Sequence, residues 1–224
     1  MCGRFTLTVD PADLQMQLDL KEVPAQLQPR YNIAPTQPVA VVTSATDRRV
    51  EIFQWGLIPS WSKDPSMASR MINARAETIH EKPAYRGPFA RRRCLILADG
   101  FYEWKQLDKG KQPHYIRLAS GEPFAFAGLW DHWTSPEGDE RRTCTIITCE
   151  PNELMAQLHN RMPVILDKGM MWEWLDPAAT PIGLRALLVP YAKPMTAYPV
   201  SRAVNKPDND GPDCVKPEGS TLRQ

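Results

Sequence analysis

The apolar positions of this chain fall into short runs, and most of these runs have the spacing of β-strands. Residues 50–55 alternate apolar and polar side chains, which is typical of a strand with one buried face. The apolar residues 39–43 precede them across a polar turn around Thr46 and Asp47, so the pattern predicts a β-hairpin. Further strands are predicted at residues 94–98, 114–118, 124–130, 143–148 and 164–166.

The predicted helices are fewer and short. Asp10 followed by Pro11 combines an N-cap residue with the proline that suits the first helical position. Leu14, Leu18 and Leu20 give the next turns a partial apolar face. Further helices are predicted at residues 151–158, 168–175 and 182–188.

The order of these elements predicts an α+β fold. Strands outnumber helices and come in runs, so we expect a single domain with a mostly antiparallel, barrel-like β-sheet core and peripheral short helices. The 22 prolines among 224 residues favour short elements, because proline interrupts helix interiors and central strands. Residues 1–205 are expected to form the domain, and residues 206–224, with almost no apolar side chains, a flexible tail.

Composition and charge narrow the classes of function. The net charge of +1 gives no overall attraction to nucleic acid, so a DNA contact requires a local patch. The odd number of cysteines, five, and the absence of a secretory leader predict a cytoplasmic protein with free thiols. For the oligomeric state, a monomer is the default expectation. No apolar run is long enough to span a bilayer. Neither a zinc-ligand spacing nor a glycine-rich phosphate loop is present, so we expect no metal and no cofactor.

Cys2 is the candidate nucleophile. Aminopeptidases remove an initiator Met1 when the next residue is small, as it is here. The chain would then begin with an α-amine and a thiol on adjacent carbons. An α-amine has a pKa of about 7.7–8.0, against about 10.4 for lysine, so it is a ready nucleophile at neutral pH. Such an aminothiol can condense with an aldehyde and close to a thiazolidine; alternatively, Cys2 is only a tolerated second residue.

Three other polar residues lie in short, specific segments. Glu103, between Tyr102 and Trp104, has aromatic neighbours that favour the protonated carboxyl a general acid needs, or it is an exposed strand carboxylate. His159 closes a helical stretch and is a proton carrier or a partner of the helix dipole. Asn73 orients a substrate hydroxyl or caps a turn.

Arginine and tryptophan offer candidate contacts to DNA. Arg4, Arg75 and Arg161 lie beside these candidates, and guanidinium groups suit bidentate phosphate contacts, although salt bridges are their commoner role. Trp61 lies in a proline-flanked polar loop, where it stacks on a base or belongs to the core. The arginines at 91–93 form a phosphate patch only if they face the same cleft.

Taken together, these segments resemble the SRAP family, the SOS-response-associated peptidases that process abasic sites. The resemblance runs in order over about residues 1–205, which makes it specific. Its segments are residues 1–5 (Met-Cys-Gly-Arg-Phe), 31–36, 55–57, 72–78, 99–105, 159–163 and 199–201.

The resemblance implies a protein that binds single-stranded DNA and forms a covalent thiazolidine with the ring-opened abasic-site aldehyde. Cys2 matches the family's nucleophile, Glu103 its acid–base glutamate, and His159 the histidine that handles protons on the sugar. Asn73 matches the asparagine that positions the N-terminus and the substrate. A lyase side activity and autocatalytic removal of Met1 are also implied, as is a bacterial cytoplasmic protein that joins the nucleoid at damaged DNA.

The same resemblance places a set of residues at or near family DNA contacts: Arg4, Asn32, Trp61, Arg75 and Arg161. Two other classes of function stay open at this point. The first is an N-terminal-nucleophile glutamine amidotransferase, in which the thiol attacks an amide carbonyl. The second is a non-catalytic nucleic-acid-binding module in which Cys2 is incidental.

Overall fold

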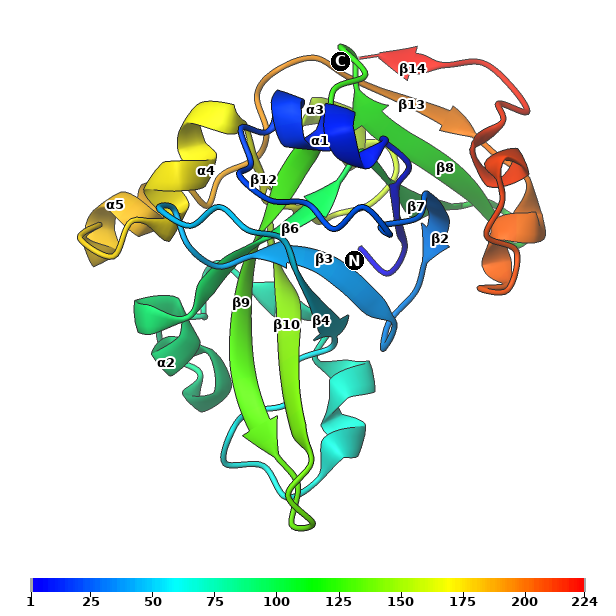
Figure 1. Ribbon diagram of the computed structural model, residues 1–224. Helices are drawn as coiled ribbons and strands as arrows, with labels where there is room; N and C mark the ends of the chain where they lie inside the picture. The colour runs from blue at the N-terminus through cyan, green and yellow to red at the C-terminus, as the bar shows by residue number, and fades with distance from the viewer. Residues whose placement is uncertain (1, 224) are drawn as a thin grey trace.

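The central feature of the fold is a closed five-stranded β-barrel, seen in the computed structural model, which describes residues 2–223 (Figure 1). Around the barrel, β10 pairs with β4, β4 with β3, β3 with β6, β6 with β9, and β9 again with β10. Only the β10–β4 pair in this ring is parallel. The strands are β3 (Pro38–Val42), β4 (Glu51–Trp55), β6 (Arg93–Ala98), β9 (Phe124–Thr134) and β10 (Glu140–Cys149).

A second, six-stranded sheet packs against the barrel, and all of its pairs are antiparallel. Its strands, in spatial order, are β14 (Leu222–Arg223), β13 (Met195–Pro199), β8 (Lys111–Leu118), β7 (Gly100–Gln106), β1 (Phe5–Leu7) and β2 (Arg30–Ile33). The chain therefore places its first strand inside this sheet, between β7 and β2.

Short helices and strands surround the two sheets. The α-helices are α1 (Pro11–Gln17), α2 (Pro83–Arg91), α3 (Glu153–Ala156), α4 (Lys168–Leu175) and α5 (Pro181–Ala186). Three 3₁₀ helices accompany them: η1 (Pro65–Arg70), η2 (Arg202–Asn205) and η3 (Pro212–Val215). The remaining strands are β5 (Asn73–Arg75) and β11 (Met162–Pro163), which pair with β10, and β12 (Ile165–Leu166), which pairs with β9. No helix within residues 2–223 is long and apolar enough to cross a membrane.

Aromatic side chains join the two sheets into one core. The ring of Phe5, from β1, lies 5.1 Å from Trp55 and 5.6 Å from Phe126 between ring centroids, both edge to face. Phe101 on β7 contacts Phe126 in the same manner at 6.0 Å. Because these rings are fully or almost fully buried, each contributes about 1.5–3 kcal/mol of burial free energy. The N-terminal strand is thereby fixed to the barrel.

The fold class expected from the sequence is confirmed, together with most of its elements. The hairpin forms as β3 and β4, and the helix predicted at 168–175 is α4. The second sheet was not foreseen, because β7 is buried on both faces over residues 100–103 and so lacks an alternating pattern. Helix α2 was missed as well, because it carries Pro88 in its interior.

The run of arginines at 91–93 is not a phosphate patch. The guanidinium of Arg93 is buried and donates to the carbonyl oxygens of Phe89 and Ala90, at the end of α2, and of Trp174 and Asp176, at the end of α4. A cation there satisfies the last carbonyls of two helices and complements their dipoles.

In contrast, Arg92 forms an ion pair with the buried Asp131 on β9. Arg91 alone of the three is exposed. Arg93 thus joins the ends of α2 and α4, and Arg92 joins the end of α2 to the barrel strand β9.

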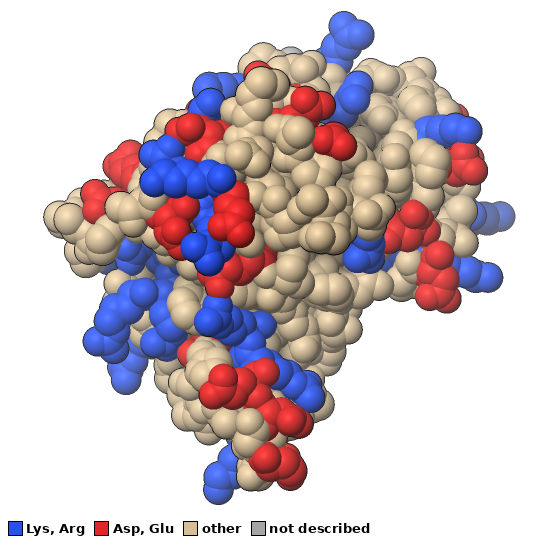
Figure 2. Space-filling model, viewed as in Figure 1, with Lys and Arg blue, Asp and Glu red and all other residues tan. Residues whose placement is uncertain are grey.

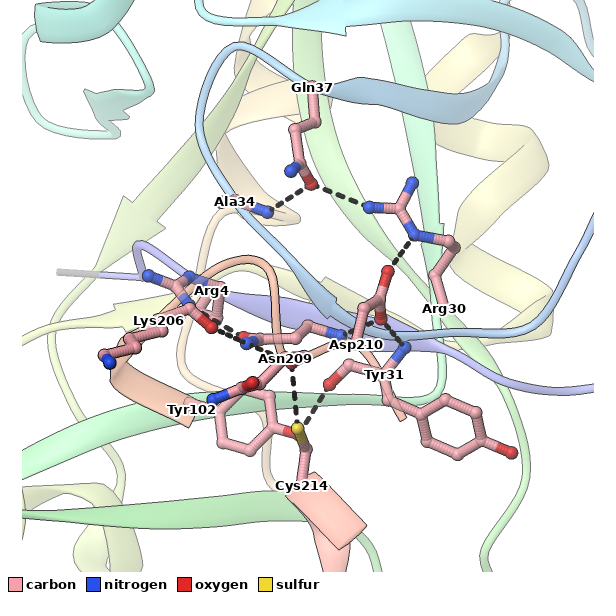
Figure 3. A network of polar contacts seen from close by, with 11 residues as sticks. Arg4, Arg30, Tyr31, Ala34, Gln37, Tyr102, Lys206, Asn209, Asp210 and Cys214 are labelled. Carbon is pink, nitrogen blue, oxygen red and sulfur yellow. Dashed lines mark hydrogen bonds and ion pairs between the residues drawn. The ribbon is translucent and has the colours of Figure 1, made fainter. Parts of the chain in front are cut away.

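The segment after residue 205, expected to be a flexible tail, instead packs along the second sheet. Strand β14 pairs with β13, and the tail's carboxylate Asp210 accepts hydrogen bonds from the backbone N–H groups of Tyr31 and Asn32 (Figure 3). The same carboxylate forms an ion pair with Arg30. The low count of apolar residues misled the prediction, because polar contacts to backbone groups fix this segment.

Asn32 lies at the centre of these contacts. Its side chain is fully buried, and its amide nitrogen donates to the carbonyl oxygens of Val204, Lys206 and Asn209 at 3.1, 3.0 and 2.7 Å. Its Oδ1 accepts from Arg4 Nη1 at 2.8 Å. The expectation that Asn32 contacts DNA does not match this position, because every polar atom of the side chain is occupied inside the protein.

We expect Asn32→Ala to lower the free energy of unfolding by about 2–3 kcal/mol, because it removes a donor to the carbonyl oxygens of Lys206 and Asn209 and one of the two acceptors of Arg4. Urea titration followed by tryptophan fluorescence measures this loss. Lys206→Ala is the control, since only the backbone of Lys206 takes part, and its expected change is within about 0.5 kcal/mol. Equal losses in the two variants would contradict the structural role of Asn32.

Candidate functional site

The site forms where the chain enters β1, at the junction of the barrel and the second sheet. Cys2 is fully buried, and its carbonyl oxygen accepts a hydrogen bond from Asn73 Nδ2 at 2.8 Å. Its thiol lies 3.9 Å from the carbonyl oxygen of Arg4, which in turn accepts from the backbone N–H of Tyr102. Met1, whose removal the sequence suggests, lies outside the described residues.

Burial determines the protonation state of the Cys2 thiol. Loss of hydration raises its pKa far above the ordinary value, and the nearby carboxylate of Glu103 raises the pKa further. The thiol is therefore protonated at neutral pH, and a nucleophilic thiolate is disfavoured.

Glu103 lies on β7 with only 3% of its surface exposed, which rules out an exposed strand carboxylate. Its burial does not come from the aromatic neighbours that the sequence suggested. Successive side chains of a strand point to opposite faces, and Tyr102 and Trp104 belong to a separate cluster with Tyr198 on the far face. Phe101, on the same face as Glu103, belongs to the main core. The face of β7 that meets the barrel thus lowers the polarity around the carboxyl group.

His114 on β8 lies directly opposite Glu103 in the antiparallel β7–β8 register, and the sequence gave no sign of this pairing. The imidazole is buried, and its Nδ1 lies 3.1 Å from the carbonyl oxygen of Gln112. Because a carbonyl only accepts, Nδ1 carries the proton. Burial lowers the pKa of His114, and the nearby Lys105 lowers it further. Only the register of β7 and β8 shows that His114 lies opposite Glu103.

Asn73 opens β5, which runs parallel to β10 with Asn73 opposite Ile146. Its backbone carbonyl accepts from the Tyr85 hydroxyl on α2 at 3.4 Å. While Nδ2 holds Cys2, the Oδ1 atom is buried and accepts no hydrogen bond from residues 2–223. An amide oxygen in this position is available to a hydroxyl donor. Asn73 therefore orients the N-terminal segment, and it does not merely cap a turn.

His159 follows α3, and its backbone N–H donates to the carbonyl oxygen of Met155 at 2.8 Å. The backbone N–H of Arg161 donates to His159 Nδ1 at 3.0 Å. Nδ1 also lies 3.2 Å from the carbonyl oxygen of Arg161, so two backbone atoms of Arg161 contact the ring at Nδ1. His159 is half-buried, and these contacts fix the orientation of its ring.

The five expected DNA contacts occupy different environments. Arg75 is exposed and forms no ion pair within residues 2–223, while Trp61 is 62% exposed in the loop after β4, which excludes a core role. Arg161 is held by Glu77, and Arg4 by Asn32 and the carbonyl oxygen of Val204, while stacking over Trp104 at 5.9 Å.

Hydrogen bonds and electrostatics join Cys2, Asn73 and Glu103 directly. His159 belongs to the adjoining loop, which is tied to β10 through Arg161 and Thr148. No cluster of three or more metal-ligating side chains is present between residues 2 and 223. The arrangement suits reactions of an amine and a neutral thiol with an electrophile.

Comparison with known proteins agrees with this geometry. The family model described as SOS response associated peptidase (SRAP) matches residues 1–207. The chain is 47% identical over 222 residues to the abasic site processing protein YoqW of Bacillus subtilis, covering 96% of this chain and 99% of YoqW. It is 33% identical to the abasic site processing protein HMCES of Gallus gallus, covering 97% of this chain and 78% of HMCES.

A crystal structure of a Bacteroides thetaiotaomicron protein has the same fold, with a TM-score of 0.87 and 28% sequence identity. The superposition covers 96% of this chain and 99% of that one. The ordered motifs, the two-sheet architecture and the match over residues 1–207 lead to one conclusion: this chain belongs to the SOS response associated peptidase (SRAP) family.

Proposed function

We propose that this protein processes abasic sites in DNA by forming a covalent cross-link between Cys2 and the ring-opened sugar aldehyde. The proposal rests above all on the arrangement of Cys2, whose carbonyl is held by Asn73 and whose thiol lies within electrostatic reach of Glu103. The relatives YoqW and HMCES are both named as abasic site processing proteins, which supports the same substrate.

The chemistry requires an amine before a thiol. After removal of Met1, the α-amine adds to the aldehyde carbon, and the adduct loses water to give an imine. The neutral thiol then adds to the imine carbon, and its proton moves to the nitrogen, which closes the thiazolidine with one water as the only by-product. The raised pKa of the Cys2 thiol suits this order, because a protonated thiol does not compete with the amine for the aldehyde.

Glu103 and His159 would carry the protons of this sequence. Glu103 is the group next to Cys2 that can protonate the departing hydroxyl and accept the proton of the attacking amine. His159, whose ring is held at Nδ1 by the backbone of Arg161, would protonate the ring oxygen as the sugar opens. Loss of a proton from the carbon next to an uncyclised imine would expel the phosphate on the following carbon and cleave the strand, which is the proposed lyase side activity.

The same buried thiol disfavours the glutamine amidotransferase reading. That mechanism needs the thiolate as nucleophile, with the α-amine as its base. Here burial and Glu103 both raise the thiol pKa, so the thiolate is scarce. Self-removal of Met1 remains part of the proposal, with Glu103 as the proposed proton carrier.

Single-stranded DNA is the proposed partner of a monomeric protein. Arg75 and Trp61 are the exposed candidates for a phosphate and a base contact, with Arg4 and Arg161 at the border of the site. Basic and acidic side chains lie next to one another on the face seen in Figure 2, so no strong field of one sign draws DNA to that face. A covalent bond makes a high electrostatic affinity unnecessary.

The decisive test is intact mass spectrometry of the protein before and after incubation with a single-stranded oligonucleotide that carries one abasic site. We expect a wild-type chain without Met1 and a denaturation-resistant adduct, and no adduct with Cys2→Ala. Cys2→Ser keeps the amine and should give only an imine, detectable after borohydride reduction. Retention of Met1, or an adduct in Cys2→Ala, would contradict the proposal.

Glu103→Gln should slow cross-linking by about 10²-fold, since the variant keeps the size of the side chain but cannot exchange a proton. Binding to an oligonucleotide with a non-reactive abasic analogue, which has no aldehyde, should be unchanged. The measurements are single-turnover gel assays for the rate and fluorescence anisotropy for binding. A wild-type rate in this variant would remove Glu103 from the mechanism.

Arg75→Gln and Trp61→Ala should weaken non-covalent binding in different ways. Loss of one phosphate contact should reduce the slope of log affinity against log salt by about 0.7, the value for single strands. Loss of a stacked base should cost about 1–3 kcal/mol with no change in slope. Anisotropy titrations from low to high salt separate the two, and equal slopes for Arg75→Gln and wild type would exclude the phosphate contact.

A further inference from the structure

Glu77, which neither the motif analysis nor the proposed mechanism assigns a role, lies two residues beyond β5. The turn that carries it is fixed to β10, because the backbone N–H of Ala76 donates to the carbonyl oxygen of Thr148 at 2.9 Å. Its carboxylate accepts a bidentate pair of hydrogen bonds from Arg161, at 2.6 Å from Nη1 and 3.0 Å from Nη2. This planar fork fixes the guanidinium in orientation as well as in position.

Arg161 makes a third contact that anchors it to the barrel. Nη2 also donates to the carbonyl oxygen of Thr148 at 2.6 Å, so that one carbonyl receives both Ala76 and Arg161. Only 15% of the Arg161 side chain is exposed, against 48% for Glu77. Three segments therefore meet at one backbone oxygen: the turn after β5, the end of β10 and the loop between α3 and β11.

The backbone of Arg161 transmits this fixation to His159. Nδ1 of His159 lies 3.0 Å from the backbone nitrogen of Arg161 and 3.2 Å from its carbonyl oxygen, so the backbone of Arg161 holds the imidazole in place. Strand β11 begins at the next residue, Met162, which pairs with Cys149 on β10. The loop between α3 and β11 thus has two attachments to β10, one through the backbone of β11 and one through the Arg161 side chain.

We propose that Glu77 is a positioning residue, which through Arg161 holds the loop of His159 in the orientation that the cross-linking reaction needs. The inference rests on the proposed function of His159. Glu77 would not contact DNA or the reacting atoms, and its role is to keep Nε2 of His159 directed at the sugar.

Charge and exposure agree with a positioning role. The hydrogen bonds from Arg161 hold the pKa of the Glu77 carboxyl below its ordinary value, so the carboxylate persists through the neutral range. Glu77 is half-exposed, and an ion pair with a carboxylate in contact with water contributes little to global stability. The consequence of losing it should therefore appear in the reaction rate, while folding is largely preserved.

The test is a single-turnover cross-linking assay with a labelled single-stranded oligonucleotide carrying one abasic site, at a series of protein concentrations. Each variant yields a rate constant at saturation, a half-saturating concentration and an amplitude. The variants are Glu77→Gln, Arg161→Lys and the combination of the two. Glu150→Gln is the matched control, because it removes the same charge from an exposed position at the end of β10.

Glu77→Gln should reduce the saturating rate constant about tenfold, since small displacements of a reacting group are costly. The half-saturating concentration should be unchanged or lower, because a negative charge near DNA is lost. Arg161→Lys should have a similar effect on the rate, and the double variant should be no slower than the slower single one, since both act through one contact. Glu150→Gln should match wild type.

Two results would overturn the inference. One is a wild-type rate constant in Glu77→Gln with only a lower amplitude, which indicates a purely structural role in the folded fraction. The other is a multiplicative loss in the double variant, which indicates independent actions of Glu77 and Arg161. Failure of the proposed function is distinguishable from both, because the wild-type protein would then give no Cys2-dependent adduct at all.

Discussion

The pairing of β1 between β2 and β7 is the constraint on which the site depends. A chain terminus is ordinarily free to move, yet here the third residue after Cys2 is already opposite Phe101 and Ile33 in a sheet. Behind it, Asp99 accepts hydrogen bonds from the Thr6 hydroxyl and from the backbone of Thr8 and Val9. Any displacement of this strand would move Cys2 itself.

The same strand explains why the site lies between two sheets. The aromatic side chain of Phe5 packs against the barrel residue Phe126, while the carbonyl of Cys2 meets Asn73 on β5, which pairs with the barrel strand β10. Glu103 reaches Cys2 from the second sheet. Cys2 just before β1, Asn73 on β5 and Glu103 on β7 thus come from separate segments, and packing of the sheets brings them together.

The sequence alone predicted the fold class and the family, because motif order and strand alternation are local properties. It did not predict the roles of side chains whose partners are distant along the chain. Asn32 was taken for a DNA contact, although its amide serves backbone carbonyls more than 170 positions away. Glu77 gave no signal for the same reason, since Arg161 lies 84 positions along the chain.

The sequence also did not show which residues surround the side chain of Glu103. Its flanking aromatic residues suggested an apolar pocket, and the carboxyl group is indeed buried, but by the opposite face of the strand. His114 became visible only through the β7–β8 register. Position within a motif identified the chemical group, and only tertiary structure identified its surroundings.

The contacts that residues 204–210 make with β2 and Arg4 affect the order in which parts of the protein fold during synthesis. Asp210 and the carbonyls of residues 204–209 fasten β2 and Arg4, so the neighbourhood of Cys2 is complete only when the final segment has left the ribosome. The N-terminal segment is therefore enclosed last, although it is made first. Until residues 204–210 arrive, β2 and Arg4 lack the partners that hold them in place.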